Sequence, residues 1–271
     1  MPQHNPAPVF DLSVIIPAYN EAPRILSPLQ SIVEYLSAQK RSYEIIVVDD
    51  GSFDETATVV HEFARHLSSV RLIRLPTCAG KGGAVRQGML AAEGRLQLFT
   101  DADGATAITE LDRLEQAIQA GADVAIGSRS LALQCRDFTV NARWHRTVLG
   151  GCFNTIVRMG GISGISDTQC GFKLFKRAIA CDLFSVSTIN GYGFDLELLY
   201  VAQQRGYRVT EVPVNWSDQP GSKVRVLRDG LAMLRELAVI RRNGRKGYYS
   251  SSSHARNFHP VAVSQLDLPP R

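Results

Sequence analysis

Two aspartates separated by one residue, Asp101 and Asp103, form the pair in this sequence whose spacing most directly suggests chemistry. They follow the apolar run 96–100, which is typical of a buried strand, and ligands of α/β sheets bind beyond the carboxyl ends of strands. Two carboxylates this close repel each other unless a cation lies between them. Mg²⁺ and Mn²⁺ prefer oxygen ligands and leave coordination positions for phosphate oxygens. The pair therefore indicates a metal-bound diphosphate, with a solvated turn or a helix cap as the alternative.

The elements that must position this pair alternate along the chain. Segments with helical spacing separate short apolar runs, which predicts strands at 12–17, 44–48, 70–75, 96–100 and 123–126 and helices at 28–39, 55–67, 84–92 and 111–119. This alternation is typical of βαβ units and a mainly parallel sheet. The strands lack a polar face, which indicates that helices cover both sides of the sheet. The expected fold class is α/β, with a Rossmann-like sheet flanked by helices.

Polar side chains recur where the predicted strands end. Because parallel strands end at the same edge of a sheet, we expect these side chains to converge. They offer what a nucleoside diphosphate needs, namely a pocket for the base, carboxylates for N–H or hydroxyl groups, and metal ligands. Neither GxGxxG after the first strand nor GxxxxGK[ST] is present, which argues against a dinucleotide-binding turn and a P-loop. The residues concerned are Tyr19, Glu21, Asp49, Asp50, Lys81, Asp101 and Asp103.

Length and composition indicate one large globular domain with short appendages. The chain has 271 residues, of which 45% are hydrophobic and 21% charged, and its net charge is +4. Five cysteines without a CxxC pair predict a reducing compartment rather than a disulfide framework. The polar N-terminus predicts no secretion signal, and no apolar run reaches the about 18 residues that span a bilayer. We expect a cytoplasmic protein and no nucleic-acid partner.

Several ordered motifs resemble those of inverting family-2 glycosyltransferases, which have the GT-A fold. The first four are SVIIPAYNE at 13–21, VVDDGS at 47–52, GKG at 80–82 and DAD at 101–103. Three later motifs resemble the polyprenyl-phosphate sugar transferases, and among them the dolichyl-phosphate β-glucosyltransferases: GSR at 127–129, DTQCGFKLF at 167–175 and NWSDQPGSKV at 215–224. The resemblance implies a GT-A domain over 11–243, and the composition of the flanking residues predicts a flexible tail at 1–10 and a mostly disordered tail at 244–271.

The resemblance implies a donor site for UDP-glucose with Mg²⁺ or Mn²⁺. Related mannosyltransferases complete the metal site with a glutamine, where this chain has Ala105 as in the glucosyl group, so we expect weak metal binding without nucleotide. A GDP-mannose-dependent transferase and a non-catalytic nucleotide-sugar binding protein are the alternatives. The residues carried over are Pro17, Tyr19 and Glu21 around the nucleotide, Asp50 as acceptor of a uracil hydrogen bond, Lys81 near the donor, Asp101 at the ribose or a metal-bound water, and Asp103 as metal ligand.

The implied acceptor is the phosphate of a polyprenyl or dolichyl lipid. This phosphate is ionised near neutral pH, so the reaction needs no strong general base, and attack opposite the nucleotide inverts the sugar linkage. Guanidinium groups are well suited to hold such a phosphate. Asp195 is expected either to bind sugar hydroxyls or to stabilise the start of a helix. At the acceptor phosphate we expect Arg129, which also counts with Asp101 and Asp103 as catalytic, Arg146 with Arg143 as its competitor, and Ser222 and Lys223.

Two segments are candidates for contact with the membrane that carries such a lipid. Residues 148–165 are apolar with a single charge, and a helix at 226–240 has an apolar stripe that ends in the basic cluster 241–246. Anionic lipid attracts such a cluster by about 1 kcal/mol per charge near the surface. The alternative is a helix packed on the sheet with a solvated basic end. We expect peripheral association with the inner face of the membrane through C-terminal amphipathic helices.

Overall fold

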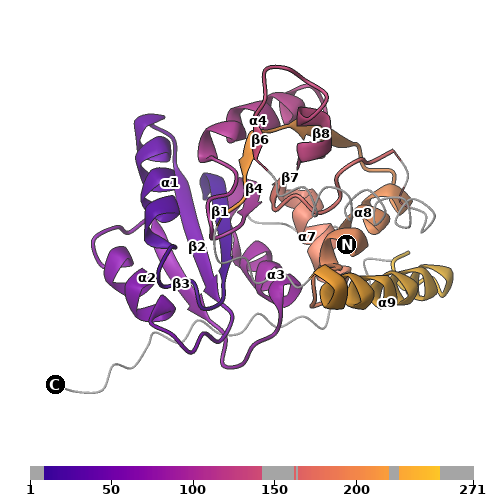
Figure 1. Cartoon of the computed structure of the whole chain (residues 1–271), viewed down its shortest axis with the longest axis horizontal. Coiled ribbons are helices and arrows are strands. Elements are labelled where there is room, and N and C mark those ends of the chain that lie inside the picture. Colours follow the sequence, from indigo (N-terminus) through magenta and orange to yellow (C-terminus); the bar gives the residue numbers. More distant parts are fainter. Residues whose placement is uncertain (1–8, 142–161, 163, 220–225, 251–271) are drawn as a thin grey trace.

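A seven-stranded sheet forms the centre of the protein (Figure 1). The computed structural model describes residues 9–141, 162, 164–219 and 226–250. The strands pair in the order β3-β2-β1-β4-β7-β5-β8, with bounds β1 Phe10–Ala18, β2 Tyr43–Asp49, β3 Val70–Arg74, β4 Gly94–Thr100, β5 Val124–Ser128, β7 Phe172–Lys176 and β8 Val209–Pro213. A separate two-stranded sheet consists of β6 (Val140–Asn141) and β9 (Trp216–Ser217). The strands predicted from the sequence are all present, within a few residues of their expected bounds.

The sheet is mainly parallel, as predicted. β1 pairs in parallel with β2 and β4, β2 with β3, and β5 with β8. β7 runs antiparallel between β4 and β5, so that Phe172 lies opposite Thr100 of β4. Neither β7 nor β8 was expected from the sequence pattern. β7 brings the motif at 167–175 from late in the chain to the end of β4, where the loop that contains Asp101 begins.

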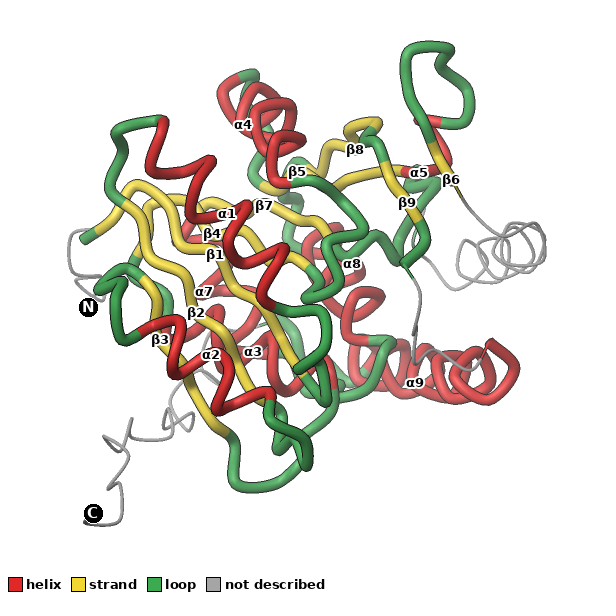
Figure 2. Tube along the Cα trace, turned by 60° about the vertical axis from the view of Figure 1, so that its left-hand side comes forward, coloured by secondary structure: helices red, strands yellow, loops and turns green. Residues whose placement is uncertain are grey.

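Helices cover both faces of the sheet (Figure 2). Their bounds are α1 Leu26–Ala38, α2 Thr56–Ala64, α3 Lys81–Ala91, α4 Leu111–Gln119, α5 Arg129–Ala132, α7 Arg177–Val186, α8 Phe194–Gln204 and α9 Val226–Arg245, with a 3₁₀ turn at Ile108–Glu110. Strand side chains alternate between two cores. In β1, Val14 and Ile16 belong to the core with α1, α2 and α4, whereas Ile15 belongs to the core with α3, α7, α8 and α9. Apolar strands without a polar face are therefore explained by burial on both sides.

Helix α3 begins at Lys81, three residues before the start predicted at Ala84. Gly80 precedes it with φ +90°, a value that glycine adopts readily. A Cβ at Gly82 would lie 2.6 Å from the Ile189 carbonyl oxygen, a distance that real Cβ atoms do not show. The helix can begin at Lys81 because Gly82 leaves room for the loop at 189–191, which packs directly against the first turn. This close contact places Lys81 at the N-terminus of α3.

Helix α9 confirms the helix predicted at 226–240 and extends it to Arg245. Met233, Leu237 and Ile240 are buried in the core that includes α8. Leu231, which belongs to the predicted apolar stripe, is 61% exposed. Part of the stripe therefore packs against the protein, as the alternative interpretation holds, and part of it faces outward.

The described chain continues past α9 to Ser250, beyond the domain boundary expected at residue 243. Tyr249 is buried, and its hydroxyl donates to the Glu197 carboxylate (2.7 Å), so residues 244–250 are held against the fold. Residues 251–271 of the expected tail, and residues 148–161 of the predicted interfacial segment, lie outside the described residues. Every helix within the described ranges is too short or too polar to span a bilayer.

Candidate active site

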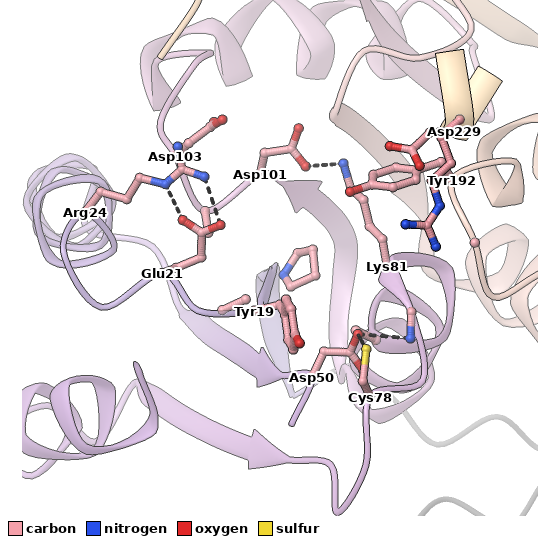
Figure 3. A pocket seen from close by; sticks show the side chains of 17 residues that line it. Tyr19, Glu21, Arg24, Asp50, Cys78, Lys81, Asp101, Asp103, Tyr192 and Asp229 are labelled. Atoms are coloured by element: carbon pink, nitrogen blue, oxygen red, sulfur yellow. Dashed lines mark hydrogen bonds and ion pairs between the residues drawn. The ribbon is translucent and has the colours of Figure 1, made fainter. Parts of the chain in front are cut away.

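The predicted donor-site residues line one open pocket of about 690 Å³ (Figure 3). The pocket lies at the carboxyl ends of β1, β2 and β4, and the first turns of α3 and α9 complete it. Its volume is in the range of small-molecule sites. All the residues expected around the nucleotide and the metal are in its wall, namely Pro17, Tyr19, Glu21, Asp50, Lys81, Asp101 and Asp103. The convergence predicted for Tyr19, Glu21, Asp50, Lys81, Asp101 and Asp103 is confirmed, whereas Asp49 is fully buried, pairs with Arg74 (3.3 Å) and does not line the pocket.

Asp101 forms an ion pair with Lys81 across this pocket. The distance from Lys81 Nζ to Asp101 Oδ1 is 2.6 Å, and both side chains remain partly exposed. Burial alone would lower the pKa of the Lys81 amine, but the carboxylates of Asp101 and Asp195 raise that pKa above its usual value. Lys81 is therefore a permanent cation at the N-terminus of α3, where positive charge favours a phosphate.

Gly171 leaves the space that the Asp101 carboxylate occupies. The Asp101 N–H donates to the Gly171 carbonyl oxygen (3.2 Å). A Cβ on Gly171 would lie 2.0 Å from Asp101 Oδ2. Gly171 is the residue before β7, so the unpredicted antiparallel strand is what brings this glycine to the aspartate. The glycine in the motif at 167–175 is thus explained by the position of Asp101.

Gly171→Ala is expected to lower activity strongly and to leave the fold in place. The added methyl group would displace Asp101 from Lys81, whereas the backbone at this residue has no left-handed φ that alanine would resist. We expect kcat/KM to fall by about a hundredfold, the size of effect known for loss of one aligned polar group in a site. The matched control is Gly230→Ala, where a Cβ meets no atom within 4 Å. Equal losses of kcat/KM in the two variants would contradict this explanation.

Asp103 lies beside Asp101 in the pocket wall. Gly104 follows it with φ +69°, and the Ala105 N–H donates to Asp103 Oδ1 (3.1 Å), which fixes the turn. Burial, and then the charge of Asp101, raises the pKa of the Asp103 carboxyl group. This adjacent pair fits a hard cation, which would relieve the repulsion between the two carboxylates. The described residues contain no group of three or more His, Cys, Asp or Glu side chains that would hold a metal alone, so phosphate oxygens would complete the coordination.

Arg24 is a pocket residue that the sequence analysis did not identify (Figure 3). Its guanidinium bonds twice to the Glu21 carboxylate, with Nη2–Oε1 at 2.9 Å. Hydrogen bonds to Glu21 raise the pKa of Arg24, and the charges of Asp103 and Asp101 contribute. The spacing of three residues between Glu21 and Arg24 was the signal available in the sequence. Glu21 thus holds a second permanent cation at the end of the pocket where the predicted metal ligands lie.

Asp50 holds the loop that precedes α3. Its carboxylate accepts hydrogen bonds from the N–H groups of Ala79 (2.6 Å) and Gly80 (2.9 Å) and from the Cys78 thiol (3.3 Å). A carboxylate has about four acceptor positions, so a ligand N–H can bind in addition. The role of Asp50 as acceptor of a uracil hydrogen bond stays a prediction.

Arg129 is held by Asp167 and is not among the residues that line the pocket. Its Nε and Nη2 each donate to a different Asp167 oxygen at 2.7 Å. The Glu211 carboxylate accepts from the Asp167 N–H (2.9 Å), which fixes this aspartate in turn. The guanidinium carbon lies 5.4 Å from the centroid of the Trp216 ring. Arg129 is therefore held by Asp167 next to the NW motif, and its role at the acceptor phosphate stays a prediction.

Asp195 does not line the pocket, contrary to the expectation that it faces the sugar. It is buried and pairs with the buried amine of Lys173 (2.6 Å). The Nζ atoms of Lys173 and Lys81 lie 5.4 and 5.7 Å from the centroid of the same Phe99 ring. The buried Lys173–Asp195 pair therefore lies next to the Lys81–Asp101 pair and deeper in the protein. Its place in the first turn of α8 agrees with the alternative expectation of helix stabilisation.

Four residues expected at the acceptor lie outside the described residues, namely Arg143, Arg146, Ser222 and Lys223. Conversely, one wall of the pocket was not expected from the sequence. The loop between α7 and α8 and the first turn of α9 contribute Gly191, Tyr192, Arg228 and Asp229 to it. We find no local motif that marks these four residues, because they reach the pocket only through the packing of α9 on α8.

Comparison with known proteins gives relatives over most of the chain. The profile of glycosyl transferase family 2 matches residues 13–184. Dolichyl-phosphate beta-glucosyltransferase from Drosophila melanogaster is 40% identical over 252 residues, with 88% of this chain and 77% of that protein covered. The protein of the same name from Homo sapiens is 36% identical over 249 residues, with 87% and 76% covered.

Solved structures share the fold at lower identity. Glucosyl-3-phosphoglycerate synthase from Mycobacterium tuberculosis, in complex with Mn²⁺, UDP and glucosyl-3-phosphoglycerate, has a TM-score of 0.63 at 20% identity, with 88% of this chain and 81% of that chain covered. Mannosyl-3-phosphoglycerate synthase from Rubrobacter xylanophilus has a TM-score of 0.66 at 18% identity, with 88% and 75% covered. The fold is that of the GT-A glycosyltransferases. Within this class, the chain belongs to glycosyl transferase family 2.

Proposed function

We propose that this glycosyltransferase moves glucose from UDP-glucose to the phosphate of a polyprenyl or dolichyl lipid and inverts the linkage to β. The names of the Drosophila and human relatives, both dolichyl-phosphate beta-glucosyltransferases, support this sugar and this acceptor. The observation that carries the proposal is that Asp50, Lys81, Asp101 and Asp103 line the same pocket at the sheet edge.

The chain's own residues would bind and orient the donor. We expect Tyr19 and Asp50 to contact the base and Lys81 and Asp101 to contact the diphosphate, since all four residues line the same pocket. Lys81, charged at all physiological pH values, would offset the negative charge that develops on the leaving UDP. The lipid phosphate is itself an ionised nucleophile, so the protein needs to hold two anions in line rather than to remove a proton. Arg129, and Arg146, Ser222 and Lys223 by resemblance, are the proposed partners of that phosphate.

A divalent cation, Mg²⁺ or Mn²⁺, would be held by Asp103 and Asp101. The fit rests on two adjacent carboxylates in the pocket wall and on the raised pKa of Asp103. A structure of the same fold contains Mn²⁺ together with UDP, which supports a divalent metal. When bound, the cation supplies positive charge at the leaving diphosphate. Ala105 offers no further ligand, which agrees with metal binding that depends on the nucleotide.

UDP-glucose binding is expected to weaken as the pH falls. The loss should begin at a higher pH than it would if the metal ligand were a carboxylate with the pKa of an ordinary aspartate. The pKa of Asp103 is raised, so as the pH falls this group takes up a proton, and loses its capacity to bind metal, earlier than a solvated aspartate. Protons and metal compete for the same oxygens, so a higher Mn²⁺ concentration should move the loss to lower pH. Calorimetric titration with UDP-glucose across pH, at two Mn²⁺ concentrations and without acceptor, measures this shift. A midpoint that does not respond to Mn²⁺ would count against Asp103 as the ligand.

We further propose that the protein works as a peripheral protein at the inner face of the membrane, with α9 at the lipid surface. The outward side of α9 presents Arg235 and Arg242 as exposed cations, together with the exposed Leu231. Flotation with vesicles that contain anionic phospholipid should recover the protein at low salt and lose it at high salt. The variant Arg235→Glu/Arg242→Glu should bind less than wild type. Flotation that is unaffected by both the salt and the charge reversal would contradict docking through α9.

The proposed reaction is tested by direct conversion. Purified protein is incubated with UDP-glucose, Mn²⁺ and a polyprenyl phosphate. The lipid fraction is then examined for the polyprenyl phosphate that carries glucose on its phosphate group. Formation of that lipid with release of UDP supports the proposal. Turnover of GDP-mannose alone would assign a different donor, and turnover of no donor would favour a binding protein.

A further inference from the structure

Glu236, in the middle of α9, contacts the loop at 190–193 that forms one wall of the pocket. The Gly193 N–H donates to Glu236 Oε2 (2.8 Å). Gly193 is the N-cap of α8, so the carboxylate lies at the positive end of that helix. This bond connects α9, the last helix of the described residues, to a loop that lines the donor pocket.

Two glycines make room for the Glu236 carboxylate. A Cβ on Gly191 would lie 2.1 Å from Oε1, and a Cβ on Gly193 would lie 2.4 Å from Oε2. Neither glycine has a left-handed φ, so backbone conformation does not explain them. The carboxylate therefore occupies the space that side chains at both positions would need. This close fit is independent of the hydrogen bond and points to the same function for Glu236.

The loop held in this way carries a pocket residue and bears on α3. Tyr192, between the two glycines, lines the pocket beside Lys81 and Asp229 (Figure 3). The Asn190 carbonyl oxygen accepts from the Gly82 N–H (2.8 Å) in the first turn of α3. A shift of the loop would therefore move Tyr192 and the helix end from which Lys81 projects.

We propose that Glu236 is a positioning residue for the nucleotide-sugar site, through its hold on the loop at 190–193. Glu236 fixes the position of the pocket wall that consists of Tyr192 and, from α9, Arg228 and Asp229. This wall lies opposite the end of the pocket that contains Asp103. The inference rests on the proposed function in that it takes the ligand of this pocket to be a nucleotide sugar. Glu236 itself is not among the residues that line the pocket, so its effect passes through its neighbours.

Removal of the carboxylate should weaken donor binding more than it slows turnover. For Glu236→Ala we expect the KM for UDP-glucose and the Kd for UDP to rise by about tenfold, the factor that corresponds to loss of one charge-assisted hydrogen bond, with a smaller change in kcat. Glu236→Gln keeps an acceptor for the Gly193 N–H and should recover most of the affinity. The matched control is Glu62→Ala, which removes an exposed carboxylate from α2 and should change neither constant.

A double-mutant cycle identifies the contact itself. Gly191→Ala places a methyl group where Oε1 lies, so it should raise the UDP Kd in the wild-type background and have little effect when Glu236 is already alanine. Amide hydrogen exchange at residues 189–194 should be faster in Glu236→Ala than in wild type. Additive effects of the two substitutions, or an unchanged Kd despite faster exchange, would overturn the proposal.

The same measurements separate this inference from the proposed function. A wild-type protein that neither transfers glucose nor binds UDP would remove the proposed function. In that case, faster exchange at residues 189–194 in Glu236→Ala would still support the anchor, and unchanged exchange would overturn it.

Discussion

Asp103→Asn is expected to lower the rate of glucosyl transfer by about a thousandfold or more, because a metal ion supplies several kcal/mol of charge stabilisation at a leaving diphosphate. The substitution removes a negative ligand and keeps the size of the side chain. It also removes the burial of a charge and the repulsion from Asp101, which together raise the pKa of Asp103, so the folded state should not lose stability. The measurement is kcat/KM at saturating Mn²⁺, accompanied by thermal unfolding.

A matched substitution distinguishes this effect from a general loss of charge. Asp137→Asn removes an exposed aspartate that does not line the pocket, and it should leave both the rate and the melting temperature unchanged. If Asp103→Asn retains activity that still depends on Mn²⁺, then another group holds the metal. If Asp103→Asn instead unfolds at a much lower temperature than wild type, its carboxylate has a structural role that we have not assigned.

Lys173→Met is expected to lower the free energy of unfolding by about 3–5 kcal/mol, since it leaves the buried carboxylate of Asp195 without its partner. Both members of the pair are almost fully buried, and the lysine amine also donates to the Cys170 carbonyl oxygen. Burial raises the pKa of the Asp195 carboxyl group, against the charge of Lys173, so loss of the lysine should favour the protonated form further. Urea unfolding at neutral pH measures the change.

The double variant Lys173→Met/Asp195→Leu separates the stability of this pair from its effect on the site. Apolar residues of similar volume often replace a buried ion pair without loss of stability, so the double variant should recover much of what the single variant loses. Its activity should stay below that of wild type, because Lys173 and Lys81 contact the same Phe99 ring and loss of the pair changes the packing next to Lys81. A double variant as unstable as the single one would show that the hydrogen bond to Cys170, rather than the ion pair, is the stabilising contact.

Much of the fold and the donor site could be predicted because their signals are local. The strands that end before Tyr19, Asp50 and Asp101 are short apolar runs, and the residues after them lie at one edge once the sheet is parallel. No distant contact had to be known for this inference. The start of α3 was predicted less well, since its glycines make room for a loop that lies more than a hundred residues later in the chain.

The parts that could not be predicted depend on long-range packing. β7 inserts between β4 and β5 with the opposite direction, and no spacing within the chain indicates which neighbours a strand takes. Asp195 looked like a pocket residue at a helix start, but the lysine that neutralises it comes from β7. Tyr192 and Asp229 carry no motif and enter the pocket because α9 packs on α8.

The late insertion of β7 also affects the order in which the chain folds during its synthesis. Until residues 172–176 leave the ribosome, β4 and β5 lack their shared neighbour, and each presents an unpaired backbone edge that invites wrong association. Pairing between segments so far apart is slower than the formation of local hairpins and helices. Asp101 acquires its backbone partner, the carbonyl of Gly171, only when this strand docks. Nascent chains that stop short of β7 are therefore expected to be both catalytically silent and prone to aggregate.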